Sequence, residues 1–243
     1  MNILGKMVLI TGGSRGIGKE IAKSFYTEGA KLILVSENEP ELTEAIKELN
    51  GNSLENRAEY FVCDLSEPSR ILELISQVSQ KYNTIDILVN NAGIGIYKSL
   101  KDLSLKEWSK SYAIDVTAPF VLIKELLPLL EKSEEPLVIN IGSLSGVKPY
   151  PNRSAYCSTK AAFRQLSLCL SEEYKDQKIK FCHITLGSTL TAFGPLSVEK
   201  KKEKEAQGKK YFTPEFIGQK VAGLVKNDKV LPEVVLDPEQ VLQ

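Results

Sequence analysis

The 243-residue sequence contains a single histidine, His183, and this scarcity excludes several kinds of chemistry. A metal site built from several imidazoles cannot form, and a Ser-His-Asp hydrolase would have to depend on this one residue. His183 lies in the apolar run 179–186, which is typical of a buried strand. We therefore expect no metal centre.

Cysteine is also scarce, and none of the four cysteines falls in a Cys-x-x-Cys pair. Their neighbours are mainly apolar or small, which favours reduced thiols that pack as small hydrophobic side chains over disulfides or a zinc site. This use of cysteine predicts a cytoplasmic protein. The four residues are Cys63, Cys157, Cys169 and Cys182.

The sequence has neither an excess of one charge nor a long hydrophobic run. Lys plus Arg and Asp plus Glu both number 31, so we expect no binding of nucleic acid through bulk positive charge. No apolar run approaches the roughly 20 residues of a membrane span. The N-terminus lacks the basic and apolar segments of a signal peptide. With 42% hydrophobic and 26% charged residues, the composition predicts a globular protein.

Apolar runs alternate with segments of helical spacing along the chain. The runs predict strands at 6–11, 32–35, 60–63, 85–89, 137–141, 179–186 and 230–236. The helical spacing predicts helices at 16–28, 39–50, 66–82, 104–131, 154–175 and 213–226. This alternation predicts an α/β fold with a single doubly wound, Rossmann-type parallel sheet and helices on both faces. Because no linker or repeat interrupts it, residues 1–243 are predicted to form one domain.

A glycine-rich turn, Thr11-Gly-Gly-Ser-Arg-Gly-Ile-Gly18, follows the first predicted strand. Glycines permit a sharp turn and a close approach of backbone N–H groups to a phosphate, and the next helix adds a favourable dipole. The spacing is not the G-x-G-x-x-G pattern, and Glu20 excludes a P-loop because Ser or Thr should stand there. A plain tight turn is the alternative. Ligands of doubly wound sheets bind at the carboxyl ends of strands, which favours a phosphate site.

Tyr156 and Lys160 are four residues apart in a predicted helix, so they share one of its faces. A neighbouring ammonium lowers the pKa of a tyrosine, which would let Tyr156 exchange a proton near neutral pH. Ser143 follows the fifth predicted strand, at the sheet edge where the glycine turn also lies. Taken alone, such a Tyr–Lys pair is usually an aromatic residue beside a solvated lysine. Its position after the glycine turn and the serine favours catalysis.

These motifs together resemble those of the short-chain dehydrogenases/reductases, from Lys6 to about Thr191. The resemblance rests on the turn 11–18, Asp64, the Asn90-Asn-Ala-Gly93 stretch, Ser143, Tyr156 and Lys160. It implies an oxidoreductase that transfers a hydride between a nicotinamide and a carbonyl or alcohol, with Tyr156 as general acid/base. Ser143 would hold the substrate oxygen, and Lys160 would bind ribose and tune Tyr156. The alternatives are a non-catalytic dinucleotide-binding or sensor protein of this fold, and a lyase or epimerase.

The resemblance also implies a cofactor site and a choice of cofactor. NADP(H) is favoured over NAD(H), because Arg15 can meet a 2′-phosphate and Ser36 replaces the Asp of many NAD-dependent members. Glu37 argues against this choice. The implied cofactor-binding residues are Gly12, Ser14, Arg15, Gly16, Ile17, Gly18, Ser36, Asp64, Leu65, Asn91, Ala92, Gly93, Tyr156, Lys160, Gly187, Thr189 and Thr191.

One departure from the family pattern falls among the catalytic residues. Asp115 stands where the family usually has an Asn that supports a water in the proton relay, and its charge would act on Lys160. The catalytic set is therefore Ser143, Tyr156, Lys160 and Asp115.

The remaining expectations from the resemblance concern the substrate and the partners. The implied substrate-side residues are Tyr97, Ser143, Ser145 and Tyr150, and a lid is expected at about 190–212. The resemblance also implies a small carbonyl or alcohol substrate and a homodimer or homotetramer.

Overall fold

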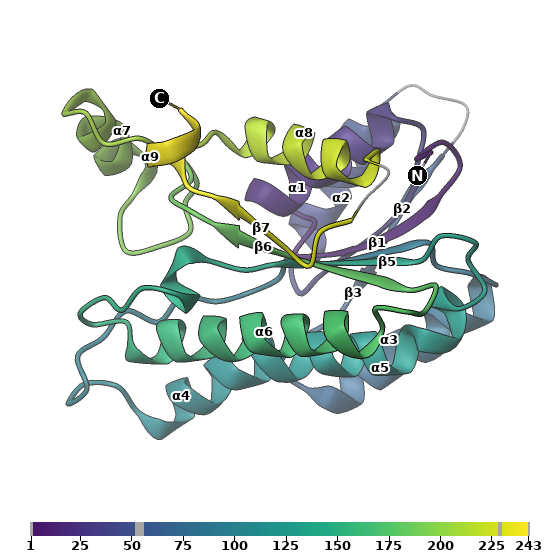
Figure 1. Ribbon diagram of the computed structural model, residues 1–243, viewed down its shortest axis with the longest axis horizontal. Coiled ribbons are helices and arrows are strands. Elements are labelled where there is room, and N and C mark those ends of the chain that lie inside the picture. The colour runs from purple at the N-terminus through teal and green to yellow at the C-terminus, as the bar shows by residue number, and fades with distance from the viewer. Residues whose placement is uncertain (1, 52–55, 228–229, 243) are drawn as a thin grey trace.

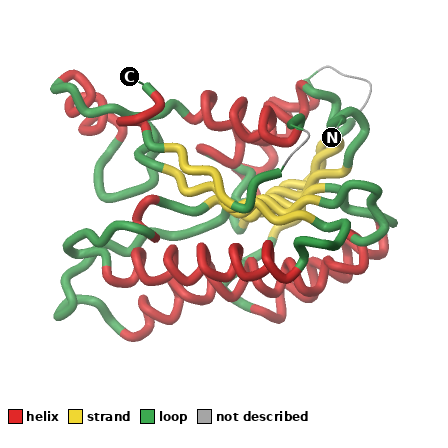
Figure 2. Tube along the Cα trace, viewed as in Figure 1, coloured by secondary structure: helices red, strands yellow, loops and turns green. Residues whose placement is uncertain are grey.

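The computed structural model describes residues 2–51, 56–227 and 230–242, so positions 1, 52–55, 228–229 and 243 of the predicted domain lie outside it. Its strands form one parallel sheet in the order β3-β2-β1-β4-β5-β6-β7. The strands are β1 (Met7–Thr11), β2 (Lys31–Ser36), β3 (Ala58–Val62), β4 (Ile87–Asn90), β5 (Leu137–Ile141), β6 (Lys180–Leu186) and β7 (Glu233–Leu236). Helices cover both faces of this sheet (Figures 1 and 2), so the predicted doubly wound α/β fold is confirmed.

The helices divide between the two faces of the sheet as Figure 1 shows. One face carries α1 (Gly16–Thr27), α2 (Glu39–Asn50) and α8 (Pro214–Val225). The other carries α3 (Pro68–Lys81), α4 (Leu105–Tyr112), α5 (Ala118–Leu130) and α6 (Ser154–Glu173). Two short helices, α7 (Val198–Ala206) and α9 (Pro238–Val241), follow β6 and β7.

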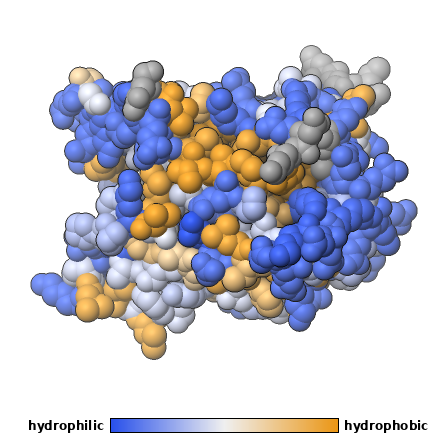
Figure 3. Space-filling view, viewed as in Figure 1, coloured by the Kyte–Doolittle hydropathy of each residue, from blue (hydrophilic) through white to orange (hydrophobic). Residues whose placement is uncertain are grey.

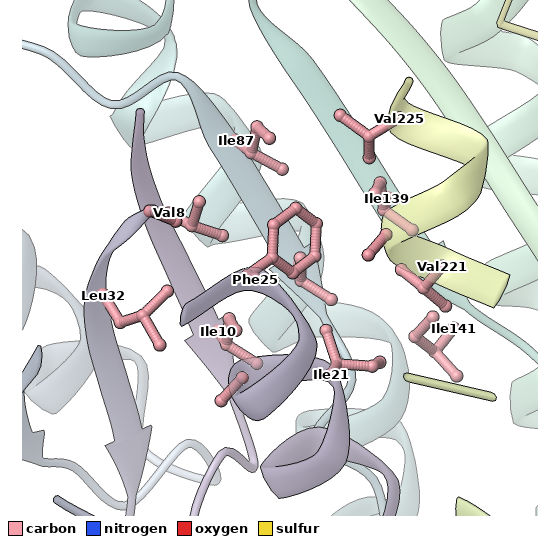
Figure 4. Close-up of a cluster of buried hydrophobic side chains, with 14 of the residues drawn as sticks. Val8, Ile10, Ile21, Phe25, Leu32, Ile87, Ile139, Ile141, Val221 and Val225 are labelled. Atoms are coloured by element: carbon pink, nitrogen blue, oxygen red, sulfur yellow. The ribbon is translucent and has the colours of Figure 1, made fainter. Parts of the chain in front are cut away.

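Successive strand residues supply the two cores. Val8 and Ile10 of β1 point into the core under α1, α2 and α8, whereas Leu9 points into the core under α3 and α5. In Figure 4, Ile21 and Phe25 of α1 lie over the strands of the first core, beside α8. Because both faces are buried, the strands read as unbroken apolar runs in the sequence.

The predicted helix 104–131 begins as expected but is not regular throughout. Ser104 and Glu107 form a reciprocal capping box. Between α4 and α5, however, Ala113–Thr117 form a π-helical turn, η1, in which the Ala118 N–H donates to the Ala113 carbonyl. The physical reason is Pro119, which has no amide hydrogen and crowds the carbonyl four residues earlier, that of Asp115. A single regular α-helix was therefore the wrong prediction at this turn.

The edge strand β7 and the loop before it leave apolar side chains on the surface. Val235 and Leu231 are about half exposed, and Figure 3 shows apolar residues gathered in this region, beside α8. No helix in the described part of the chain is long and apolar enough to cross a membrane.

His183 fills a space that Gly142 leaves open. A Cβ at position 142 would lie 2.0 Å from His183 Nε2, so no side chain fits there beside the ring. His183 is fully buried, and neither ring nitrogen has a hydrogen-bond partner in the described part of the chain. Burial lowers the pKa of His183 to about 4, so the imidazole is neutral at pH 7.

Candidate active site

The glycine turn joins β1 to α1 and requires glycine for steric reasons. Gly12 and Gly16 have φ values of 64° and 56°, in the left-handed region that glycine adopts without strain. A Cβ at Gly18 would lie 2.1 Å from the Gly12 carbonyl oxygen. These three glycines keep the turn compact and let it pack closely against the stretch after β4.

The stretch after β4 holds this turn in place. Asn91 Nδ2 donates to the carbonyls of Thr11 and Gly12, at 3.0 and 3.1 Å. Thr11 Oγ1 accepts from the N–H groups of Asn91 and Ala92, at 3.0 and 3.1 Å. The neighbours β1 and β4 are also where the strand order reverses, which is the usual ligand crevice of such sheets.

The start of α1 suits an anionic group. Its N-cap residue, Arg15, makes no side-chain cap, and its first turn contains no acidic residue. The N–H groups there point toward the glycine turn, and Ile17 packs its side chain against the core below. A dinucleotide pyrophosphate therefore fits this turn, because backbone donors and the helix dipole both favour it.

An open pocket of about 560 Å³ lies beyond this turn, at the end of β2. Arg15 reaches it as expected, but Arg15 Nη1 lies 3.2 Å from Glu41 Oε1. Ser14 Oγ is hydrogen-bonded to Glu41 Oε2 at 3.0 Å and to Ser36 Oγ at 3.1 Å. Sequence reasoning missed Glu41, because its side chain arrives from the first turn of the next helix. The pocket is lined by Arg15, Ser36, Glu37, Asn38, Glu39, Pro40, Glu41 and Val62.

Asp64 and Leu65 follow β3 at the same edge of the sheet. Asp64 Oδ1 accepts from the Ser66 hydroxyl at 2.7 Å and from the Ser66 N–H at 2.8 Å. These hydrogen bonds lower the pKa of Asp64. Leu65 is buried, so Asp64 is the member of this pair whose side chain remains accessible.

The predicted serine, tyrosine and lysine come together at the start of α6. Ser143 precedes a short 3₁₀ helix, η2 (Leu144–Gly146), and its hydroxyl accepts from the Ser145 N–H at 3.1 Å. The Ser143 hydroxyl is also close enough to Tyr156 to lower the pKa of that phenol. Lys160 Nζ lies 5.7 Å from the centre of the Tyr156 ring, and both residues are buried. Ser145 is itself buried, and the hydrogen bond from its N–H orients the Ser143 hydroxyl.

The Tyr156 hydroxyl holds its proton more firmly than the sequence suggests. Burial raises the pKa of Tyr156, the hydrogen bond with Ser143 lowers it, and the charge of Asp115 raises it further. The sequence predicts a lowered pKa from Lys160 alone. In the structure burial outweighs such an effect, and the ammonium has a carboxylate beside it.

Asp115 is buried beside Lys160 and is not exposed on the helix surface. Its side chain is fully buried in the π-helical turn, with Oδ1 at 3.9 Å from Lys160 Nζ. Oδ1 also accepts from the Ile94 N–H at 2.9 Å, and Oδ2 accepts from Thr159 Oγ1 at 2.8 Å. A Cβ at Gly93 would lie 2.9 Å from Oδ1, so Gly93 gives the carboxylate its room. Sequence reasoning missed Thr159, although it directly precedes Lys160.

The segment after β6 approaches the glycine turn from the other side. A Cβ at Gly16 would meet Thr191 Cγ2 at 3.7 Å. Thr189 pairs with Phe212 in an isolated parallel bridge. The Gly187 N–H donates to Leu236 O at 2.7 Å, which ties the segment to β7. This segment lies at the same end of the sheet as the start of α6 (Figure 1).

Lys201 of α7 holds this segment through three hydrogen bonds. Its buried Nζ donates to the carbonyls of Thr189, Thr191 and Phe193 at 3.1, 2.8 and 2.7 Å. Burial lowers the pKa of Lys201. Because the lysine-rich stretch is otherwise exposed, nothing in the sequence marked this one lysine as buried.

Aromatic side chains surround Tyr156. The Tyr97 ring lies 5.6 Å and the Phe193 ring 5.8 Å from the Tyr156 ring, measured between ring centres. Tyr150 and Phe193 remain partly exposed. Arg153 lies over the rings of Tyr97 and Tyr150. Tyr97 and Tyr150 were expected on the substrate side and Phe193 lies in the expected lid segment, whereas Arg153 was missed.

Comparison with known proteins identifies the family. The family model described as short chain dehydrogenase matches residues 6–202. The chain belongs to the short-chain dehydrogenase family. This short-chain dehydrogenase therefore has the fold of a dinucleotide-dependent oxidoreductase, as the motifs predicted.

Relatives and solved structures are similar to this short-chain dehydrogenase over different lengths. Dehydrogenase/reductase SDR family member 7B of Mus musculus is 33% identical over 183 residues, which cover 74% of this chain but only 57% of the mouse protein. An alcohol dehydrogenase from the archaeon Thermococcus sibiricus, complexed with 5-hydroxy-NADP, superimposes with a TM-score of 0.85 at 28% identity, covering 98% and 97% of the two chains. A metagenomic short-chain oxidoreductase in complex with NADP gives a TM-score of 0.80 at 25% identity, covering 97% and 99%.

Proposed function

We propose that this protein is an NADP(H)-dependent oxidoreductase that interconverts a carbonyl compound and an alcohol, with Tyr156 as general acid/base. One observation carries the proposal. Tyr156, Lys160 and Ser143 come together at the carboxyl edge of the sheet: Lys160 follows Tyr156 by one turn of α6, and Ser143 is close enough to lower the pKa of the Tyr156 hydroxyl. Two hydroxyls that meet in this way can both hydrogen-bond one substrate oxygen.

The residues of this chain would hold the dinucleotide along the carboxyl edge of the sheet. Gly12 to Gly18 and the start of α1 would bind the pyrophosphate, and Asp64 would face the adenine. The stretch 91–93 would border the ribose, Lys160 would bind the nicotinamide ribose, and the segment 187–191 would contact the carboxamide. The fit rests on the turn described above, whose glycine backbone leads into an α1 N-terminus that no side chain caps, so its backbone N–H groups are available to a phosphate.

The chemistry assigned to the protein is proton transfer and orientation. A bound nicotinamide cofactor supplies or accepts the hydride. In reduction, Tyr156 Oη gives its proton to the carbonyl oxygen while Ser143 donates a hydrogen bond to the same oxygen. Lys160 stabilises the phenolate that remains, and Asp115 holds Lys160 in position. A tyrosine whose pKa is raised keeps its proton until the substrate oxygen takes it, which suits a general acid.

NADP(H) is the proposed cofactor on the strength of Arg15. Its guanidinium lies at the pocket that a 2′-phosphate would enter, and it would exchange Glu41 for the phosphate. Glu37 and Glu39 line the same pocket and oppose this choice. The NADP-type ligands of the two solved structures named above support it.

The lid, the assembly and the compartment complete the proposal. Residues 190–212, which include α7, would close over the substrate. A homodimer or homotetramer would cover apolar residues at the surface, such as Phe120 of α5 and Val235 of β7. The four free thiols support a reducing compartment such as the cytoplasm.

The test is a panel of ketones, aldehydes and alcohols assayed with NADPH, NADH and their oxidised forms. We expect the nicotinamide absorbance to change with at least one substrate, and more strongly with the phosphorylated cofactor. Cofactor binding without any turnover would instead identify a non-catalytic dinucleotide-binding protein. Product formation without a net absorbance change would identify a lyase or an epimerase.

A further inference from the structure

Arg153 is a positive side chain at the reacting end of the site, and no described residue gives it a negative partner. It directly precedes α6 and lies three residues before Tyr156, so it is on the Tyr156 side of that helix. Among the described residues, Lys160 faces Asp115 and Lys148 faces Asp237, but no ion pair includes Arg153.

Two tyrosine rings hold the guanidinium in place. Arg153 Cζ lies 4.8 Å from the centre of the Tyr150 ring and 5.4 Å from that of the Tyr97 ring. Contacts of this length are cation–π interactions, which fix a planar guanidinium without neutralising its charge. The N–H groups at the edge of the guanidinium therefore stay available to an acceptor.

Tyr97 connects this charge to the catalytic hydroxyl. The Tyr97 ring contacts the Arg153 guanidinium and also lies 5.6 Å from the Tyr156 ring, measured between ring centres. Burial raises the pKa of Tyr156, and the charge of Arg153 opposes that rise, so the two groups are close enough to interact electrostatically. A ligand held by Tyr156 and Ser143 would thus have Arg153 within its reach.

We propose that Arg153, held between Tyr97 and Tyr150, binds a carboxylate or phosphate group carried by the carbonyl substrate. The substrate class is then an anionic aldehyde, ketone or alcohol, whose apolar part lies against the tyrosine rings. This inference rests on the proposed function for the position of the carbonyl. A guanidinium is the cation best suited to the role, because it binds carboxylate and phosphate groups through two parallel hydrogen bonds.

The experiment compares two probes of nearly the same shape, 4-formylbenzoate and its neutral methyl ester. Binding of each to the NADP⁺-loaded protein is measured by calorimetry, and reduction of each is measured with NADPH. The native protein is expected to bind the acid about tenfold to hundredfold more tightly than the ester, as one charge-assisted pair allows. Arg153→Met should abolish this preference while leaving ester affinity unchanged, and Arg153→Lys should retain part of it.

A matched control removes a guanidinium elsewhere. Arg70→Met deletes an exposed arginine of α3 and should leave the acid-to-ester ratio as it is in the native protein. Unchanged NADP⁺ affinity in all variants shows that they are folded. An unchanged ratio in Arg153→Met, or failure of the native protein to bind the acid more tightly, would overturn the proposal. Preferential binding of the acid without turnover of either probe would count against the proposed reaction but support the anion site.

Discussion

Two carboxylate–cation pairs lie at opposite ends of the candidate cofactor site. The pair with the longer distance between its charged atoms is expected to contribute more to stability. Arg15 and Glu41 approach to 3.2 Å, but their side chains are 79% and 32% exposed. Lys160 and Asp115 are 3.9 Å apart, with side chains 5% and 0% exposed. Water screens the first pair, and long side chains lose entropy in forming it, so such pairs contribute about 0–1 kcal/mol. Burial removes that screening from the second pair.

The comparison shows how one chain can keep its ligand site adaptable at one end and fixed at the other. At the exposed end a phosphate can take the place of Glu41 at little cost in free energy. At the buried end neither partner can leave, because an unpaired charge would remain away from water. We expect cofactor preference to respond gradually to substitution at the exposed end, and stability to fall sharply when the cation of the buried pair is removed.

The largest effect is expected from Tyr156→Phe. Removing the hydroxyl deletes the proton donor, so turnover should fall by roughly 10²–10⁴-fold, while cofactor affinity changes little. Steady-state kinetics and a fluorescence titration of NADPH measure the two quantities. Tyr82→Phe removes a tyrosine hydroxyl at the end of α3 and is the control. Near-normal turnover in Tyr156→Phe would remove Tyr156 from its assigned role.

The next largest effect is expected in stability. Denaturant unfolding of Lys160→Met and Arg15→Met compares how much the buried and the exposed pair contribute. Lys160→Met leaves Asp115 charged and buried without its cation, and should lower the free energy of unfolding by about 3–5 kcal/mol. Arg15→Met should lower it by less than about 1 kcal/mol. Adding Asp115→Asn to Lys160→Met should restore part of the loss. Equal losses in the two single variants would contradict the comparison.

Cofactor preference should respond more modestly at the exposed end. Arg15→Ala is expected to weaken NADPH binding about tenfold, because the lost contact is a charge-assisted hydrogen bond to the phosphate. Glu41→Gln should strengthen NADPH binding by a few fold, because the guanidinium no longer has a competing partner. NADH, which lacks the 2′-phosphate, is the internal control in both titrations. Tighter binding of NADH than of NADPH by the native protein would refute the proposed preference.

The smallest change in rate is expected from Asp115→Asn, which keeps the size of the side chain and removes its charge. Because that charge raises the pKa of Tyr156, the pKa should fall in the variant. The alkaline decline of carbonyl reduction should then begin at lower pH, and alcohol oxidation should reach its plateau at lower pH. Full pH profiles in both directions measure the shift. Identical profiles would show that the Asp115 charge does not reach Tyr156.

The sequence predicted the parts of this molecule that depend on local pattern. Unbroken apolar runs located the strands, and the spacing of Tyr156 and Lys160 placed both on one helix face. The capping box at Ser104 was equally local. The glycine turn was recognisable because its backbone conformation restricts the residue type.

The parts that escaped prediction depend on contacts between distant segments. Glu41 meets Arg15 across 26 positions of sequence, and Lys201 is buried only because three carbonyls converge on it. The π-helical turn follows from Pro119, a local signal whose effect on helix register was not foreseen. The raised pKa of Tyr156 depends mainly on burial, which the packing of Tyr97 and Phe193 around it produces.

The contact between Gly142 and His183 has an evolutionary consequence. A Cβ at position 142 would lie only 2.0 Å from His183 Nε2, so a side chain at 142 and the imidazole at 183 exclude each other. Among homologues with this fold, a residue larger than glycine at 142 is expected only where 183 carries a smaller side chain. Because Ser143 follows directly, substitutions at this pair would also displace a proposed catalytic hydroxyl. Selection for the position of Ser143 would therefore also act on the buried His183, although His183 has no assigned part in the chemistry.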